Sequence, residues 1–184
     1  MTRLAPTRTS RRLAALLFLA ATWAVRATPF EAETFILDVP LGFQGPISFS
    51  SAEGNIIAFI KPHANASTAT LLQISILDAR SEFSVLPPRD LGSASERYLS
   101  QALEGIARLR SNFASTKSTR VSLGGLPASR VTWVGEAENR KLHGVMYCVI
   151  VNNQVFQFHT QDLDTAPPNN LHDAQSSIEH IRFK

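Results

Sequence analysis

Three side chains have types that could carry hydrolytic chemistry: His159, Asp162 and Glu136. A histidine acts as a general base when a carboxylate orients it. His159 lies in a segment of alternating polar and apolar residues, which places it on the wetter face of a strand, near Asp162 in sequence. This position favours an ordinary surface histidine over a base or a ligand. A hydrolase with a non-standard site is therefore kept as the alternative function.

Standard catalytic and metal-binding motifs do not occur in the sequence. His172 and His180 are eight residues apart, about two helical turns, which is too far to share one zinc ion. There is no His-Glu-x-x-His pattern and no Gly-x-Ser-x-Gly elbow. Gly124-Gly125 is followed by no Lys-Ser or Lys-Thr, so it predicts a turn rather than a phosphate loop. We expect no catalytic residue, no metal and no cofactor.

The chain has a single cysteine, Cys148, so it cannot form an internal disulfide. Cys148 lies between Met146 and Ile150 in an apolar strand, which indicates a small buried hydrophobic residue. A catalytic thiol would need exposure and an activating histidine.

Aromatic residues in the central segment are the candidates for a pocket that binds an apolar ligand. Trp133 shares a strand face with Val131, which favours core packing over a role in the pocket. The candidate ligand-binding residues are Trp133, Tyr147, Phe156, Phe158 and His159.

The first 27 residues read as a secretory signal peptide. Residues 1–12 are basic, residues 13–25 are apolar, and Val25-Arg26-Ala27 offers small residues for cleavage after Ala27. The alternative is a membrane anchor, but the apolar run is shorter than the ~20 residues that span a bilayer. Twin-arginine export stays open beside the general secretory route. We expect a periplasmic or secreted protein that does not span the membrane after cleavage.

The basic character of the chain belongs mostly to this leader. Five of the 18 Lys and Arg precede residue 28, where there is no Asp or Glu, so 13 basic residues face 15 acidic ones in the remainder. A nucleic-acid-binding surface needs an excess of positive charge. We therefore expect no nucleic-acid partner.

A run of strands joined by tight turns is predicted at residues 119–161. Residues 142–151 are apolar on both faces, which is typical of a central strand covered on both sides. Asn152-Asn153 suits a two-residue hairpin turn into the strand 155–161, and residues 135–141 read as a looser connection. Earlier strands are expected at residues 35–39, 47–50, 55–61 and 71–77.

Two amphipathic helices are predicted to cover this sheet. The first follows Pro87-Pro88, with Ser93 and Glu96 as a capping box and an apolar stripe that runs from Tyr98 to Phe113. The second follows Pro167-Pro168, with Asn169 or Asn170 as its cap. Its stripe consists of Leu171, Ala174, Ile178 and Ile181. We expect residues 28–184 to form one α/β domain, an α/β/α sandwich of an antiparallel sheet with one helix on each face.

Several segments resemble the PsbP-like family of exported proteins, including the bacterial DcrB-type envelope proteins. Thr34–Pro40 with Gly42-Phe43 is similar to the family's opening strand and turn, and Val121–Arg130 resembles its Gly-x-Pro-Ala strand start. Tyr147–Phe158 resembles its aromatic hairpin, and Ser177–Phe183 resembles its closing helix. The resemblance implies a non-enzymatic exported domain that binds proteins or small ligands, and no site residues transfer with it.

The leading hypothesis is an exported binding module of the bacterial cell envelope that acts on a protein partner or a small apolar ligand. An unfilled space between sheet and helix would favour the ligand, and a solid core would favour the protein partner. A structural subunit of an envelope assembly is a further hypothesis, and it predicts an exposed apolar patch. The sequence leaves the oligomeric state open.

Overall fold

A computed structural model describes residues 27–51, 54–64, 67–79 and 90–184 of the chain. The predicted signal peptide up to residue 26 and the Pro87-Pro88 segment lie outside the described residues. The elements in chain order are β1 (Thr28–Glu31), β2 (Phe35–Val39), β3 (Gln44–Ser51), β4 (Gly54–Pro62), β5 (Ala69–Asp78), α2 (Leu91–Ala107), β6 (Ser111–Ser115), β7 (Thr119–Leu123), β8 (Leu126–Ala137), β9 (Arg140–Val151), β10 (Gln154–Leu163), α3 (Pro168–Glu179) and β11 (Arg182–Phe183).

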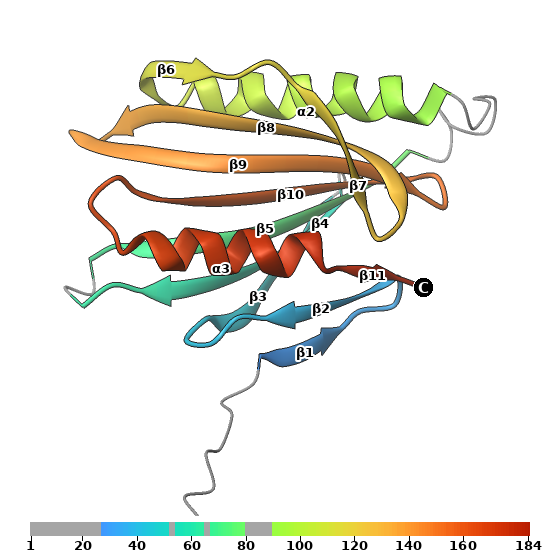
Figure 1. Ribbon diagram of the computed structural model, residues 1–184, viewed down its shortest axis with the longest axis horizontal. Helices are drawn as coiled ribbons and strands as arrows, with labels where there is room; N and C mark the ends of the chain where they lie inside the picture. Colours follow the sequence, from blue (N-terminus) through green and yellow to red (C-terminus); the bar gives the residue numbers. More distant parts are fainter. Residues whose placement is uncertain (1–26, 52–53, 65–66, 80–89) are drawn as a thin grey trace, which may run out of the picture.

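The strands form two antiparallel sheets (Figure 1). The large sheet has the order β3-β4-β5-β10-β9-β8-β6, and β7 also pairs with β8. The small sheet has the order β1-β2-β11, so the two ends of the described chain meet in it. The prediction of an antiparallel sheet with two helices is confirmed, whereas the small sheet was not predicted.

Strand β9 lies in the interior of the large sheet and is apolar on both faces, as predicted. Its residues Val145, Tyr147, Val149 and Val151 belong to one hydrophobic cluster. Met146, Cys148 and Ile150 belong to the other. Because alternate strand residues point to opposite faces, the two clusters lie on opposite sides of the sheet.

Each helix contributes to a different cluster. Ala94 and Leu99 of α2 pack in the cluster of Met146 and Cys148. Ala174 and Ile178 of α3 pack in the cluster of Tyr147, which also contains Phe35 and Leu37 of β2. Figure 1 shows α3 in front of β10 and β5, next to β2 and β11. The face on the α3 side is thus covered by a helix and a small sheet together.

Tight turns join the central strands. Asn152 and Asn153 have φ of 50° and 61°, the left-handed pair that a two-residue hairpin needs, so the predicted turn is confirmed. Glu138 and Asn139 have φ of 51° and 60°. The prediction of a looser connection at residues 135–141 is therefore wrong: β8 and β9 are paired through Ala137 and Arg140.

The predicted boundaries of both helices need correction. Helix α2 begins at Leu91 without a side-chain cap and ends at Ala107, so there is no capping box at Ser93. Phe113 lies in β6, where its ring stacks on Trp133 with centroids 5.9 Å apart. Helix α3 begins at Pro168, and no side chain caps it.

The apolar stripe of α3 is confirmed. Leu171, Ala174 and Ile178 are buried, and Ile181 is buried just after the helix ends. Asn170 is buried as well, instead of capping the helix from outside. Within the described part of the chain, neither helix has the length and apolar character of a membrane span.

Candidate functional site

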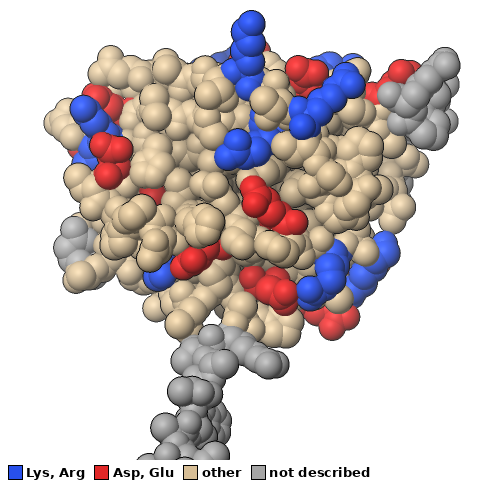
Figure 2. Space-filling view, viewed as in Figure 1, with Lys and Arg blue, Asp and Glu red and all other residues tan. Residues whose placement is uncertain are grey.

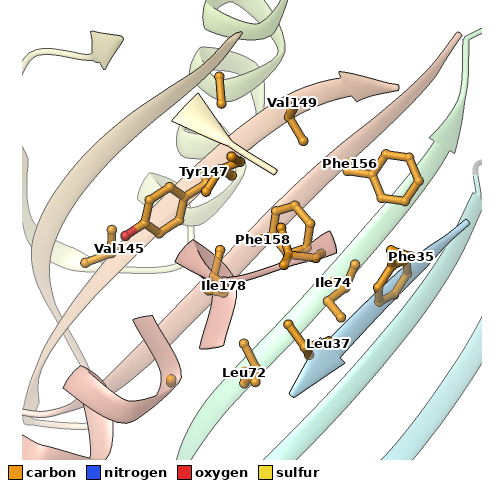
Figure 3. Packing of buried hydrophobic residues seen from close by; sticks show 14 of the residues in the cluster. Phe35, Leu37, Leu72, Ile74, Val145, Tyr147, Val149, Phe156, Phe158 and Ile178 are labelled. Carbon is orange, nitrogen blue, oxygen red and sulfur yellow. The ribbon is translucent and has the colours of Figure 1, made fainter. Parts of the chain in front are cut away.

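The aromatic residues predicted to line a pocket are divided between the two sides of the sheet. Tyr147, Phe156 and Phe158 lie fully buried on the α3 side, where Figure 3 shows them beside Ile74 and Ile178. Trp133 is buried on the α2 side. These residues therefore do not gather around one cavity.

His159 is half-buried on the α2 side of the sheet rather than exposed. It faces the α2 side of β10, and its ring centroid lies 5.7 Å from that of Trp133. Its Nε2 atom is inaccessible to solvent and has no hydrogen-bond partner among the described residues. Burial, aided by the nearby charge of Arg110, lowers the pKa of His159 to about 4. The prediction of a surface histidine is wrong, because α2 covers this part of the strand.

The structure does not assemble the predicted hydrolase site. Asp162 is three residues beyond His159 on β10, so its side chain points to the opposite face of the sheet. Glu136 lies in β8 and accepts a hydrogen bond of 2.9 Å from Asn112. The three side chains thus have separate surroundings, and His159 meets neither carboxylate.

Asp162 is instead the centre of a buried polar network. Its Oδ2 accepts a hydrogen bond of 2.6 Å from the Thr70 hydroxyl, and its Oδ1 accepts one of 2.8 Å from the Leu163 amide. His63 Nε2 lies 2.9 Å from Oδ1. His63 Nδ1 lies 2.7 Å from Thr68 Oγ1. All these contacts are satisfied when Nε2 carries the ring proton and Nδ1 accepts the Thr68 hydroxyl.

This network links a hydroxyl, an imidazole and a carboxylate in series, the order that activates a hydroxyl in nucleophilic catalysis. Two surface hollows of about 170 and 440 Å³ border Thr68. Sequence reasoning missed His63, because it meets Asp162 only through the pairing of β4 with β5 and of β5 with β10. In the sequence, Thr68 and Thr70 stand two residues apart shortly after His63, but this spacing does not identify Asp162 as the partner of His63.

A groove of about 480 Å³ opens on the α3 side of the sheet, between α3 and the β6 edge. Helix α3 packs mainly on β10, β5 and β2, so β8 lies beyond its cover. Val134 of β8 is 52% exposed there. In Figure 2, acidic and basic residues are interspersed over this side of the molecule, with uncharged surface between them. Of the predicted ligand-binding residues, Trp133 borders this groove. The lining also includes Arg130, Thr132, Val134, His143, Val145 and Leu171.

Arg130 supplies a positive charge at one end of the groove. Its Nε donates to the Tyr147 hydroxyl at 3.3 Å, and its guanidinium lies 5.7 Å from the centre of the Tyr147 ring. The hydroxyl donates in turn to Glu179 at 2.7 Å. Burial and this hydrogen bond raise the pKa of Tyr147 to about 12, so the hydroxyl stays protonated at neutral pH. The terminal nitrogens of Arg130 make no hydrogen bond to the described residues.

The groove is about as long as a short aliphatic chain. Arg130 pairs with Tyr147, and Val134 pairs with His143 at the other end. Four residues along a strand correspond to about 13 Å. An apolar floor with a few polar groups at its ends is the usual design of a site for small molecules.

A second hollow, of about 510 Å³, lies between the small sheet and β3–β4. Phe30, Phe43 and Phe59 line it together with three prolines, and none of its lining residues is charged. It has no charged side chain that could fix the head group of a ligand, whereas the groove beside α3 has Arg130, so the groove is the stronger candidate. Within the described residues, no group of three or more His, Cys, Asp or Glu is placed to hold a metal ion.

Comparison with known proteins rests on structure. The solution structure of cyanobacterial PsbP from Synechocystis sp. PCC 6803 has a TM-score of 0.58 at 8% identity and covers 89% of this chain and 96% of that chain. The crystal structure of LpqN, involved in cell envelope biogenesis of Mycobacterium tuberculosis, has a TM-score of 0.57 at 16% identity and covers 86% and 91%. No protein-family model and no curated protein matches the sequence. The similarity confirms the resemblance predicted from the opening strand and the aromatic hairpin: the chain has the PsbP-like fold.

Proposed function

We propose that this protein is an exported binding module of the bacterial cell envelope, and that the groove beside α3 holds the apolar part of a small ligand. The leader pattern of residues 1–27 supports export. The structural likeness to LpqN, a protein of cell envelope biogenesis, supports the compartment.

The groove itself is the observation that carries the proposal. Val134, Val145 and Leu171 give it an apolar floor, and its volume of about 480 Å³ lies within the range of small-molecule sites. The terminal nitrogens of Arg130 face no acceptor among the described residues, so they suit a carboxylate or phosphate at the head of an apolar ligand. A protein partner would need a broader surface than this groove offers.

Two experiments test this function. The tagged protein is purified from its own cell envelope extract, and its native mass spectrum is recorded; adducts of a few hundred daltons are expected. Binding of the apolar fluorescent probe N-phenyl-1-naphthylamine is then measured for the wild type and for Val134→Glu. A charge at this position of the groove, which a bound apolar probe would have to desolvate, should weaken binding at least tenfold, about 1.4 kcal/mol.

Leu109→Glu is the matched control, because Leu109 is 72% exposed at the end of α2, outside the groove. It should bind the probe as the wild type does. Equal affinity in all three proteins, or a spectrum without adducts, would contradict the groove as the ligand site.

Ester hydrolysis is the second candidate function, and the Thr68–His63–Asp162 chain is the observation that favours it. In this scheme Thr68 Oγ attacks the ester carbonyl, and its proton passes to His63 Nδ1 and then to the departing alkoxide. Water releases the acyl group from Thr68 by the same proton transfer, while Asp162 stabilises the imidazolium. The test is hydrolysis of 4-nitrophenyl acetate, which Thr68→Val should abolish and Ser67→Ala should preserve. A rate no higher than that of buffer alone removes this candidate.

A further inference from the structure

The free edge of the large sheet carries an exposed apolar patch. Strand β3 is the last strand on this side, and its residues 44–50 are all exposed. Phe49 is 63% exposed, Ile47 41% and Ile56 36%. Phe49 pairs with Ile56, and Ile47 lies two residues from Phe49, so the three side chains share one face.

This face is the α2 side of the sheet. Ile57 and Phe59 of β4 pack in the cluster on the α3 side. Ile56 directly precedes Ile57, and because neighbouring strand residues point to opposite faces, its side chain points to the α2 side. Helix α2 lies on this same face, but it packs mainly on β8 and β9, toward the edge of the sheet opposite to β3. The described helices therefore leave the patch uncovered.

Most of β3 also lacks the features that normally protect an edge strand. Such strands carry charged residues, prolines or bulges that prevent pairing with another chain. Here a bulge lies between Gln44 and Ile47, and Pro46 falls within it. Residues 47–51 contain no proline, and the whole strand has no charged side chain. Among the described strands none pairs with the outer side of Ile47–Ser51, so this segment is an open edge whose outward backbone groups could pair with another chain.

We propose that a second copy of this chain pairs with β3, strand to strand and antiparallel, to form one continuous sheet across a two-fold axis. An uncharged strand meets its own copy without like-charge repulsion, and it offers no charge pattern that would select a different partner. The same backbone groups face each other across the axis, as an isologous interface requires. A two-fold perpendicular to the sheet places both apolar patches on the same face, where Phe49 and Ile47 of each copy meet those of the other.

The dimer does not depend on the groove beside α3. The groove lies near the β8–β6 edge of the sheet, opposite to the β3 edge, and on the face that carries α3. Pairing through β3 leaves that groove open in both copies. Ligand binding and association are therefore separate properties, and a failure of one leaves the other standing.

Sedimentation velocity of the purified protein between 1 and 100 µM tests the proposal. The wild type should sediment as a dimer that dissociates on dilution. Phe49→Lys places two charges at the axis and should raise the dissociation constant at least tenfold. Its circular dichroism should stay unchanged, because Phe49 makes little contact with the rest of the fold. Leu109→Lys, an equal change at an exposed site just after the end of α2, should leave the dimer intact.

A positive measurement complements the loss of dimer. Phe49→Cys, with Cys148 buried, should form a disulfide-linked dimer under mild oxidation, whereas Leu109→Cys should not. A wild type that remains a monomer at 100 µM overturns the proposal. So does a dimer that Phe49→Lys does not weaken, or a different polypeptide that occupies this edge and is released by Phe49→Lys.

Discussion

Lowering the pH from 7 to 5 is expected to destabilise the fold through His159. In the folded protein burial lowers the pKa of His159 to about 4, against 6.5 for an unperturbed histidine. The unfolded state therefore takes up the proton first as the pH falls. The contribution to stability is complete above pH 6.5 and is lost between pH 6.5 and 4. The difference corresponds to about 2 kcal/mol at pH 5 and about 3 kcal/mol at the acid limit.

The assay is urea unfolding at pH 7, 6 and 5 for the wild type and for His159→Phe. Phenylalanine preserves the ring contact with Trp133 and carries no proton, so the variant should lose about 2 kcal/mol less than the wild type between pH 7 and 5. His172→Gln is the control, because His172 is exposed on α3, and its pH dependence should parallel that of the wild type. If the wild type and His159→Phe lose stability in parallel, the His159 ring is not shielded from water in the way that its inaccessible Nε2 indicates.

Three further substitutions test the core. Asp162→Asn should cost about 1–3 kcal/mol in urea unfolding, because an amide cannot accept all the hydrogen bonds that reach this buried carboxylate. Gly144→Ala should lower the unfolding free energy by about 1–3 kcal/mol, since its methyl group would lie 2.7 Å from Trp133 and 2.6 Å from a backbone oxygen; an unchanged melting temperature would contradict this packing. Tyr147→Phe removes the hydrogen bond to Glu179 and should cost about 1 kcal/mol by the same unfolding assay.

The centre of the sheet could be predicted because local patterns determine it. The apolar residues on both faces of β9 require cover on both sides, and Asn152-Asn153 tolerates the left-handed conformation of the turn. Both signals lie within a dozen consecutive residues. No knowledge of distant contacts was needed to interpret them.

The end of α2 could not be predicted from periodicity. Leu109 and Phe113 continue the helical spacing, but the helix stops at Ala107 and Asn112 takes a left-handed φ of 50°. Leu109 is exposed, and Phe113 packs from β6 against the hydrophobic cluster that α2 also joins, the cluster of Trp133 and Met146. A spacing of three or four residues shows that side chains are apolar, but not that the backbone between them is helical.

The surroundings of His159 and Asp162 depend on residues far away in the chain. Alternation along β10 placed His159 on the face opposite Phe156 and Phe158, as the structure does, yet it could not say what covers that face, and it did not place Asp162. His159 is covered because α2 crosses β10, where the carbonyl of Tyr98 accepts a hydrogen bond from Gln157. Asp162 meets His63 across 99 positions of sequence. Contacts of this kind follow from the strand order, which sequence patterns left open.

The widths of the layers explain why both proposed surfaces exist. Seven strands lie side by side in the large sheet, which makes it about 29 Å wide at about 4.8 Å per strand. One helix covers a strip about 10–12 Å wide. On the α3 side, the helix and the small sheet together cover most of the width, and a narrow strip at β8 remains as the groove. On the α2 side a single helix covers β8 and β9, so the described residues leave the strip at β3 and β4 open, with Ile47, Phe49 and Ile56. The proposed ligand site and the proposed dimer edge thus lie at opposite edges and on opposite faces of the sheet. The reason is that α3 with the small sheet covers a wider part of one face than α2 alone covers of the other.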